Sequence, residues 1–163
     1  MEAIIFCGIQ ASGKTTFYKD RFFKTHVRIS LDLFNTRRKE NIFIKTCLET
    51  QQRFVIDNTN PTIKDRAKYI EEAKQRKFKV KGYFFESTVG QAITRNKQRT
   101  GKELVPPAGI GGTFKRLQIP AYIEGFDEIF KVNIVADKFV VELMEPPASQ
   151  PGEVTDSRQL GGI

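Results

Sequence analysis

The first candidate for chemistry in this 163-residue sequence is the run of residues 8–15, which reads GIQASGKT. Its spacing, Gly-x-x-x-x-Gly-Lys-Thr, is that of a phosphate-binding loop. Glycines let the backbone curl so that successive N–H groups point at phosphate oxygens, and the following helix adds the positive end of its dipole. The Lys14 amine can reach the outer phosphates, and the Thr15 hydroxyl can ligate Mg²⁺. The run therefore predicts a binding site for ATP or another nucleoside triphosphate with Mg²⁺.

Two other interpretations of this run are weaker. A chance glycine turn needs neither the apolar residues 3–7 before it nor the helical spacing after it, and the sequence has both. A dinucleotide-binding loop requires Gly-x-Gly-x-x-Gly, but position 10 is Gln. The residues expected to contact the triphosphate are Gly8, Gln10, Ala11, Ser12, Gly13, Lys14, Thr15 and Thr16.

Asp32 follows a short strand-like segment at residues 27–30. A kinase must orient an acceptor hydroxyl against the terminal phosphate and take its proton as the new bond forms. A carboxylate at a strand end beside the phosphate loop can do this, so Asp32 is the candidate general base and acceptor contact. The alternative is that Asp32 only caps the following helix, but Ser30 is an equally good cap.

Asp57 follows a second strand-like segment, at residues 53–56, and opens the run Asp-Asn-Thr-Asn-Pro. We interpret it as a second carboxylate near the metal, acting through water and facing the substrate. The alternative is a turn residue before Pro61, where Asp and Asn are common. Asn58, Thr59 and Asn60 are candidates for contact with the acceptor or with metal-bound water, and the sequence leaves open whether they only hold the loop.

Residues 88–106 combine a helical pattern with a break and suggest a lid. Arg95 and Arg99 are four residues apart, on one face of the predicted helix. An arginine from a lid can neutralise charge on the transferred phosphoryl group, a contribution of roughly 10³-fold or more where it has been isolated. A solvated basic face is the other interpretation, because Lys97 and Lys102 lie alongside, and spacing alone does not choose between them.

The elements that must position these residues alternate along the chain. Strands are predicted at residues 3–7, 27–30, 53–56 and 78–85, and helices at 14–23, 33–52, 61–76 and 88–99. This alternation predicts an α/β fold in which helices flank both faces of a parallel sheet. Ligands bind at the carboxyl ends of the strands in such sheets. The phosphate loop, Asp32 and Asp57 should therefore converge on one cleft.

The C-terminal third is less regular. Residues 108–112, Ala-Gly-Ile-Gly-Gly, suggest a flexible connector, with short helical pieces around Pro120. Residues 130–135 and 138–143 read as a β-hairpin that turns at Ala136 and Asp137. From residue 145 onward Pro, Gly, Ser and Gln dominate. We expect one domain over residues 1–144 and a disordered tail over 145–163.

Composition narrows the class of protein. The formal net charge is +8, and the surplus lies in residues 1–144 because the last 19 residues are net acidic. This surplus favours a polyanionic partner, although basic proteins without one are common. The single histidine, His26, excludes His-based metal sites and Ser–His triads. Two cysteines, no apolar run of the ~20 residues that a membrane span needs and no signal-like start predict a cytoplasmic protein.

Four segments together resemble the kinase module of polynucleotide 5′-kinases, the end-healing enzymes of phage and animals. They are residues 8–15, Ile-Ser-Leu-Asp at 29–32, Val-Ile-Asp-Asn-Thr-Asn-Pro at 55–61 and Arg-Asn-Lys-Gln-Arg at 95–99. Tyr-Ile-Glu-Glu-Ala at 69–73 and Ala-Tyr-Ile-Glu-Gly-Phe at 121–126 are close to the animal form, and the resemblance extends to about residue 135.

The resemblance implies a P-loop NTPase-type phosphotransferase with a mobile lid. Its implied activity is transfer of the γ-phosphate of an NTP to a 5′-hydroxyl end of DNA or RNA during nucleic acid repair, with Mg²⁺. By that likeness, Lys14 and Thr15 bind phosphate and metal, Asp32 is the general base, Arg99 is the lid arginine, and Arg95 supports it.

The sequence departs from that family in two ways. The family's general base is usually set among basic residues that hold the acceptor phosphate, whereas Asp32 is flanked by Leu31 and Leu33. Arg28, Arg37 and Arg38 are candidates for that contact. There is also no Asp-x-Asp-x-Thr phosphatase motif, so the chain is kinase only or a piece of a longer protein.

Two rival functions remain at this stage. A small-molecule kinase for a sugar, nucleoside or sulfate ester shares the loop, the aspartate and the lid; the charge surplus and the Asp-Asn-Thr-Asn-Pro run speak against it. A non-catalytic, nucleotide-dependent nucleic-acid-binding module is the other rival. The sequence does not tell the donor base, the kind of acceptor or the oligomeric state.

Overall fold

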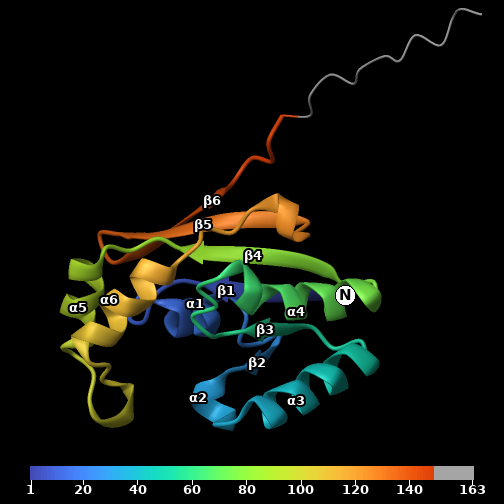
Figure 1. The fold of residues 1–163 in the computed structure, drawn as a ribbon, viewed down its shortest axis with the longest axis horizontal. Helices are drawn as coiled ribbons and strands as arrows, with labels where there is room; N and C mark the ends of the chain where they lie inside the picture. The colour runs from blue at the N-terminus through green and yellow to red at the C-terminus, as the bar shows by residue number, and fades with distance from the viewer. Residues whose placement is uncertain (149–163) are drawn as a thin grey trace, which may run out of the picture.

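A computed structural model describes residues 1–148 as a twisted six-stranded sheet with helices on both faces (Figure 1). The strand order is β2-β3-β1-β4-β5-β6, and all neighbouring pairs are parallel except β5 with β6. The strands are β1 (Glu2–Cys7), β2 (Val27–Ile29), β3 (Phe54–Ile56), β4 (Lys79–Phe85), β5 (Glu128–Val135) and β6 (Lys138–Leu143). The α/β fold predicted from the alternating pattern is confirmed.

Six α-helices connect or cover the strands of this sheet. They are α1 (Lys14–Arg21), α2 (Leu31–Phe34), α3 (Arg37–Glu49), α4 (Ile63–Gln75), α5 (Val89–Asn96) and α6 (Pro107–Arg116), with short 3₁₀ turns at Gly101–Glu103 and Tyr122–Glu124. None of the helices among residues 1–148 is both long and apolar enough to cross a membrane.

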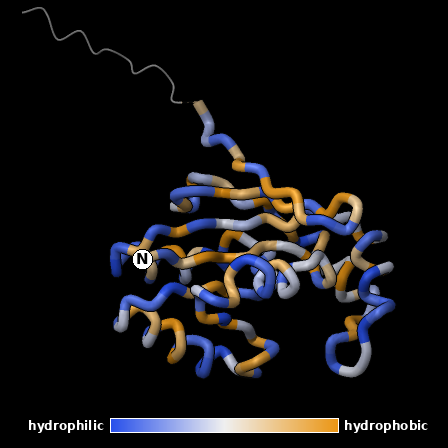
Figure 2. Tube along the Cα trace, turned by 180° about the vertical axis from the view of Figure 1, so that it is seen from behind, coloured by the Kyte–Doolittle hydropathy of each residue, from blue (hydrophilic) through white to orange (hydrophobic). Residues whose placement is uncertain are grey.

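The central strand β1 shows why the sheet is covered on both faces. Successive side chains of a strand point to opposite faces. Ala3 and Ile5 enter the core formed with α3 and α4, whereas Ile4 and Phe6 enter the core formed with α1. Figure 2 shows hydrophobic residues running along the central strands of the sheet. A strand buried on both faces reads as a continuous apolar run, which is typical of parallel sheets.

Three sequence-based boundaries were wrong, and the first two have a local reason. The predicted helix at residues 33–52 is split into α2 and α3 because Asn35 adopts a left-handed conformation, with φ 63°. The helix predicted to begin at Pro61 begins two residues later, because the Thr62 hydroxyl caps it by accepting from the Asp65 N–H at 3.2 Å. The helix predicted to reach residue 99 ends at Asn96.

The predicted flexible connector at residues 108–112 is also wrong, because it lies inside α6. Pro107 occupies the first turn, where its missing N–H costs nothing. Ile110 is fully buried with Ile9, Ala11 and Ala92. Burial of this side chain outweighs the poor helix propensity of the neighbouring glycines.

The C-terminal hairpin is confirmed. Strands β5 and β6 pair antiparallel, and Ala136 and Asp137 turn between them with φ of 48° and 60°. Both cysteines within residues 1–148 are buried and unpaired, as the sequence suggested. The tail prediction concerns mostly residues 149–163, which lie outside the described part of the chain.

Candidate phosphotransfer site

The phosphate loop joins β1 to α1 across the carboxyl end of the sheet. Gly13 has φ 95°, a conformation that glycine adopts without strain. A Cβ at position 8 would lie 2.9 Å from Phe85 Cβ, so only glycine fits there. The Gly8 N–H donates to the Thr59 carbonyl at 2.9 Å. The two glycines therefore let the loop curl while it stays attached to the segment after β3.

Lys14 is folded back over this loop. Its Nζ donates to the Gly8 carbonyl at 2.9 Å and to the Ile9 carbonyl at 2.6 Å, and the residue is only 8% exposed. Burial lowers the pKa of Lys14 to about 8, while the charges of Asp57 and Asp32 act in the opposite direction. The Arg99 charge adds to the lowering of this pKa. The charges of Asp57, Asp32 and Arg99 therefore all act on the Lys14 amine.

Asp57 lies directly after β3 and faces Thr15. The Thr15 hydroxyl donates to Asp57 Oδ2 at 2.9 Å, and the Arg28 Nε donates to the same oxygen at 2.7 Å. Asp57 is buried, with 4% exposure. Mg²⁺ prefers hard oxygen ligands and is usually held by one or two protein groups plus substrate phosphates and water. The hydroxyl and carboxylate fit that ion, with Arg28 balancing the buried carboxylate.

Asp32 lies in the first turn of α2, at the carboxyl end of β2. The cap of this helix is Ser30, whose hydroxyl accepts from the Asp32 N–H at 3.3 Å. The Asp32 residue is exposed, and its carboxylate has no hydrogen-bond or ion-pair partner within residues 1–148. Capping therefore does not use this carboxylate, which stays available to a ligand near Lys14.

The neighbours of Asp57 hold the loop together. The Asn60 amide is buried and donates to the Phe6 carbonyl at 2.8 Å, and Thr59 contributes its carbonyl to the Gly8 N–H. This geometry favours the loop-holding interpretation of Asn60. Asn58 bonds to α2 and α3 instead: its Oδ1 accepts from the Leu31 N–H, and its NH₂ group donates to the buried Glu40.

Arg95 and Arg99 lie in different local structures. Arg95 is in the last turn of α5, and its guanidinium donates to the Ala11 carbonyl at 2.9 Å and to the Ser87 hydroxyl at 3.2 Å. Arg99 lies beyond the helix, and within residues 1–148 its guanidinium makes one bond, to the Glu103 carbonyl at 3.4 Å. The prediction of one shared helical face was therefore wrong, because α5 ends between the two residues.

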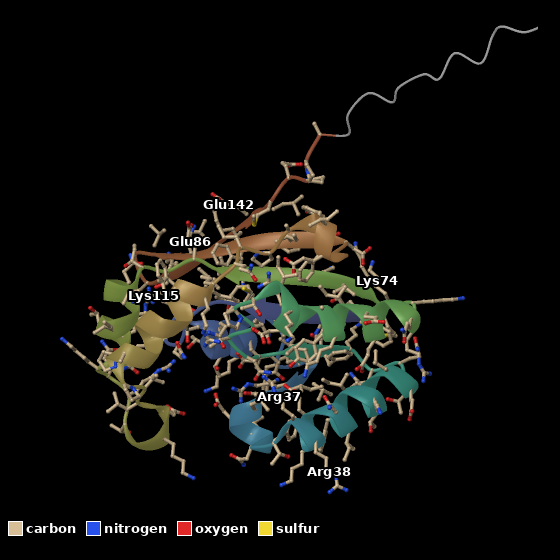
Figure 3. All side chains as sticks on the ribbon, viewed as in Figure 1. Arg37, Arg38, Lys74, Glu86, Lys115 and Glu142 are labelled. Atoms are coloured by element: carbon tan, nitrogen blue, oxygen red, sulfur yellow. The ribbon has the colours of Figure 1, made fainter. Side chains whose placement is uncertain are left out.

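The three candidates for the acceptor phosphate are not equivalent. Arg28 is bound to Asp57, and Arg37 donates to Glu40 at 2.9 Å and to the Tyr69 hydroxyl at 2.8 Å. Figure 3 shows Arg37 directed inward from the start of α3 and Arg38 directed away from the molecule. None of the three lies free beside Asp32.

Sequence reasoning missed two features near the site. Glu40 is completely buried, although it looks like an ordinary charged residue of a surface helix. Its spacing of four from Ile44 and of eight from Leu48 puts it on the buried face of α3, which is the signal that could have revealed it. Gln10 is the second: its amide donates to the Thr113 hydroxyl at 3.0 Å and so links the phosphate loop to α6.

Residues 4–117 match the model of the family described as "AAA domain", so the chain belongs to that family. Together with the loop, this defines a P-loop kinase-like, nucleotide-binding domain. Among curated proteins, the bifunctional polynucleotide phosphatase/kinase of Schizosaccharomyces pombe is similar, with 26% identity over 135 residues. The match covers 80% of this chain and 33% of that protein, so the chain spans about a third of its relative's length.

Solved structures support the fold. Kti12 of Chaetomium thermophilum, crystallised with ADP-AlF3, has a TM-score of 0.61 at 15% identity, covering 80% of this chain and 88% of that chain. A gluconokinase from Sinorhizobium meliloti 1021 has a TM-score of 0.58 at 17% identity, covering 81% of this chain and 82% of that chain. These similarities support the fold of this chain and say nothing about its substrate.

Proposed function

We propose that this protein is a polynucleotide 5′-hydroxyl kinase, transferring the γ-phosphoryl group of ATP or another NTP to a 5′-OH end of DNA or RNA in nucleic acid repair. The observation that carries this proposal is the Asp32 carboxylate, exposed and unpaired within the described residues, in the same site as the buried Lys14. A kinase needs such a base where an acceptor hydroxyl meets the outermost phosphate.

Each residue of the site has a distinct task in this proposal. Asp32 accepts the proton of the 5′-hydroxyl as the hydroxyl oxygen bonds to the γ-phosphorus. The bond from that phosphorus to the β-phosphate oxygen breaks, and the nucleoside diphosphate leaves. Lys14 and the loop N–H groups stabilise the charge on the phosphate oxygens, and Arg99 does the same from the lid. Thr15 and Asp57 would hold Mg²⁺, which would neutralise negative charge on the phosphate oxygens.

Two observations favour a nucleic acid acceptor over a small alcohol. The Schizosaccharomyces pombe relative is named as a polynucleotide phosphatase/kinase. The chain carries a formal net charge of +8, a surplus that attracts a polyanion. We further propose that residues 1–144 are the catalytic unit. Because phosphate contacts release counterions, acceptor binding should weaken steeply with salt, whereas a small uncharged alcohol should show little salt dependence.

The test measures transfer of label from γ-labelled ATP to 5′-OH oligonucleotides and to a panel of sugars and nucleosides. We expect labelled oligonucleotide, and loss of about 10²–10⁴-fold in kcat for Asp32→Asn, with ATP affinity unchanged because the carboxylate is not needed to bind the donor. Asp20→Asn, an exposed aspartate of α1, is the matched control and should keep full activity.

Three results would overturn the proposal. Normal turnover by Asp32→Asn would show that Asp32 is not the general base. Labelling of a small alcohol with none of the oligonucleotides would support the small-molecule kinase instead. Binding of nucleotide and nucleic acid without any transfer would support the non-catalytic module.

A further inference from the structure

The buried carboxylate of Glu40 on α3 has no task in the transfer scheme, yet it is 0% exposed. A buried carboxylate is costly unless its oxygens are paired. Oε2 accepts from Arg37 at 2.9 Å and lies 3.7 Å from the Lys68 amine. Oε1 accepts from the Asn58 amide at 2.6 Å and from the Tyr69 hydroxyl at 3.1 Å. Every partner of this carboxylate is a donor.

The Tyr69 hydroxyl stays a donor throughout the ordinary pH range. Burial raises the pKa of Tyr69, and the neighbouring Glu40 charge raises it further. Arg37 also donates to this hydroxyl, so the Tyr69 hydroxyl accepts from Arg37 and donates to Glu40. The carboxylate is therefore a fixed acceptor, held from both α3 and α4.

This fixed acceptor decides how the Asn58 amide is turned. A carboxylate accepts hydrogen bonds only, so the NH₂ group of Asn58 must face Glu40 and its Oδ1 must face the other way. On that side Oδ1 accepts the backbone N–H of Leu31 at 2.9 Å. A chain of two bonds thus runs from buried Glu40 to the first residue of α2.

Helix α2 needs this anchor because it has only four residues. A helix of that length is not stable alone, and its first N–H groups have no partner inside the helix. Asn58 satisfies the Leu31 N–H and Ser30 satisfies the Asp32 N–H. Asp32 is the next residue after Leu31, so its direction depends on these two bonds.

We propose that Glu40, acting through Asn58, is a positioning residue that fixes α2 and thereby aims Asp32 at the phosphate loop. Asn58 also follows Asp57 in the chain, so the same bonds tie the base to the proposed metal-binding segment. The proposal rests on the proposed function only in taking Asp32 as the base. The positions of the helix and of Asn58 can be tested without any reaction.

The test exchanges the donor and acceptor of the Glu40–Asn58 bond. Asn58→Asp places two carboxylates face to face, and we expect a loss of about 10²-fold in kcat, the scale on which a misplacement of 1 Å acts. ATP affinity should stay within about twofold. The double variant Glu40→Gln/Asn58→Asp restores one donor facing one acceptor, with the new carboxylate still accepting from Leu31, and should recover most of the loss.

Two further readouts separate positioning from plain stability. Amide hydrogen exchange at Leu31 should become at least about tenfold faster in Asn58→Asp and return toward the native rate in the double variant. Ile44→Val, one turn along the same face of α3, is the control for lost packing, and it should lower the melting temperature without changing the Leu31 rate. If Asn58→Asp does not fold, recovery of folding and turnover by the double variant carries the test.

The outcomes distinguish this inference from the proposed function. An unchanged Leu31 exchange rate in Asn58→Asp, or a double variant no better than the single variants, overturns the inference whatever the activity. If the native protein labels no oligonucleotide but Leu31 exchange responds as expected, the proposed function fails and the anchoring of α2 stands.

Discussion

The two sides of the candidate site are built differently. On one side, the phosphate loop and the segment after β3 are joined by buried bonds, such as Gly8 N–H to Thr59 O at 2.9 Å and the Asn60 amide to Phe6 O at 2.8 Å. On the other side, α5, α6 and the residues between them lie together at one end of the molecule (Figure 1). This lid reaches the loop through Arg95, through Gln10 and through a small apolar cluster.

Under the proposed function, this difference separates residues that must be preorganised from residues that must move. Metal and donor contacts act best when their geometry is set before the substrate arrives, because reorganisation then costs nothing during the reaction. A lid must open to admit substrate and release product, so its contacts need to be few and individually weak. Exposed Leu104 and the long bond of Arg99 fit the second description.

The largest predicted effect comes from a change in the fixed side of the site, which is the phosphate loop with the segment after β3. Arg66 is fully buried, pairs with Glu124 through two 2.8 Å bonds and donates to the Asn60 and Pro61 carbonyls. Arg66→Met leaves the Glu124 carboxylate buried and unpaired, which costs about 3–5 kcal/mol. We expect urea denaturation to show this loss, and the melting temperature to fall by about 10 °C.

Lys74→Met is the matched control for Arg66→Met. It breaks the Lys74–Asp127 pair, whose side chains are 39% and 34% exposed, so the loss should stay at or below about 1 kcal/mol. Equal losses of stability in the two variants would show that the buried ion pair of the fixed side contributes no more than an exposed pair.

The next largest effect comes from a substitution in the lid that should leave the fold intact. Arg99 makes one long bond to a neighbouring carbonyl, so Arg99→Ala should leave the melting temperature within about 1 °C, since such surface changes cost little. Loss of its charge from the transferring phosphate should lower kcat by about 10²–10³-fold, measured with saturating ATP. Exposed Lys97→Ala is the control and should keep its rate; a similar loss there would make the lid a general basic surface.

The fixed side was the more predictable from sequence. Glycine spacing, the strand before it and the helix after it are local signals, and they located the phosphate loop. The strand ends that carry Asp32 and Asp57 follow from hydrophobic runs of a few residues. The hairpin turn at Ala136 and Asp137 was predictable for the same reason, because turn chemistry acts within four residues.

Helix α6 and the anchor of α2 were not predictable because tertiary contacts decide them. The α6 segment carries Gly109, Gly111 and Gly112 and reads as a loop until Ile110 finds its buried partners. The charge of Glu40 predicts that its side chain is exposed to solvent. Residues distant in the chain, such as Asn58 and Tyr69, make its burial possible. Local propensity carries no record of such partners.

A third prediction sharpens the comparison through pH. Burial lowers the pKa of Lys14 to about 8, so the free protein loses this charge as pH rises through 8. Polyphosphate binding requires the charged form, so ATP affinity should fall above pH 8, by up to about tenfold per pH unit. Isothermal titration calorimetry between pH 7.5 and 9.5 measures this, and Lys14→Met should give weak binding without that slope.

The lowered pKa of Lys14 also predicts how the stability of the free protein changes with pH. A lysine whose pKa is lower in the folded state binds its proton less tightly there than in the unfolded chain, so charged Lys14 destabilises the fold below pH 8. This contribution of Lys14 should make the free energy of unfolding rise between pH 8 and 10.5, the ordinary pKa of a lysine. Lys14→Met removes that component, and an identical pH dependence in this variant would contradict the assignment.

The smallest predicted effect loosens the lid at its contact with the loop. Thr113→Val removes the hydroxyl that accepts from the Gln10 amide at 3.0 Å, at a cost of about 1 kcal/mol. Amide exchange in α6 should become about fivefold faster, while exchange near Asn60 stays unchanged. Thr94→Val is the matched control, because its hydroxyl also bonds the carbonyl four residues earlier but is exposed. Equal acceleration at Asn60 would mean that the two sides open as one unit, and the division between a fixed side and a lid would be lost.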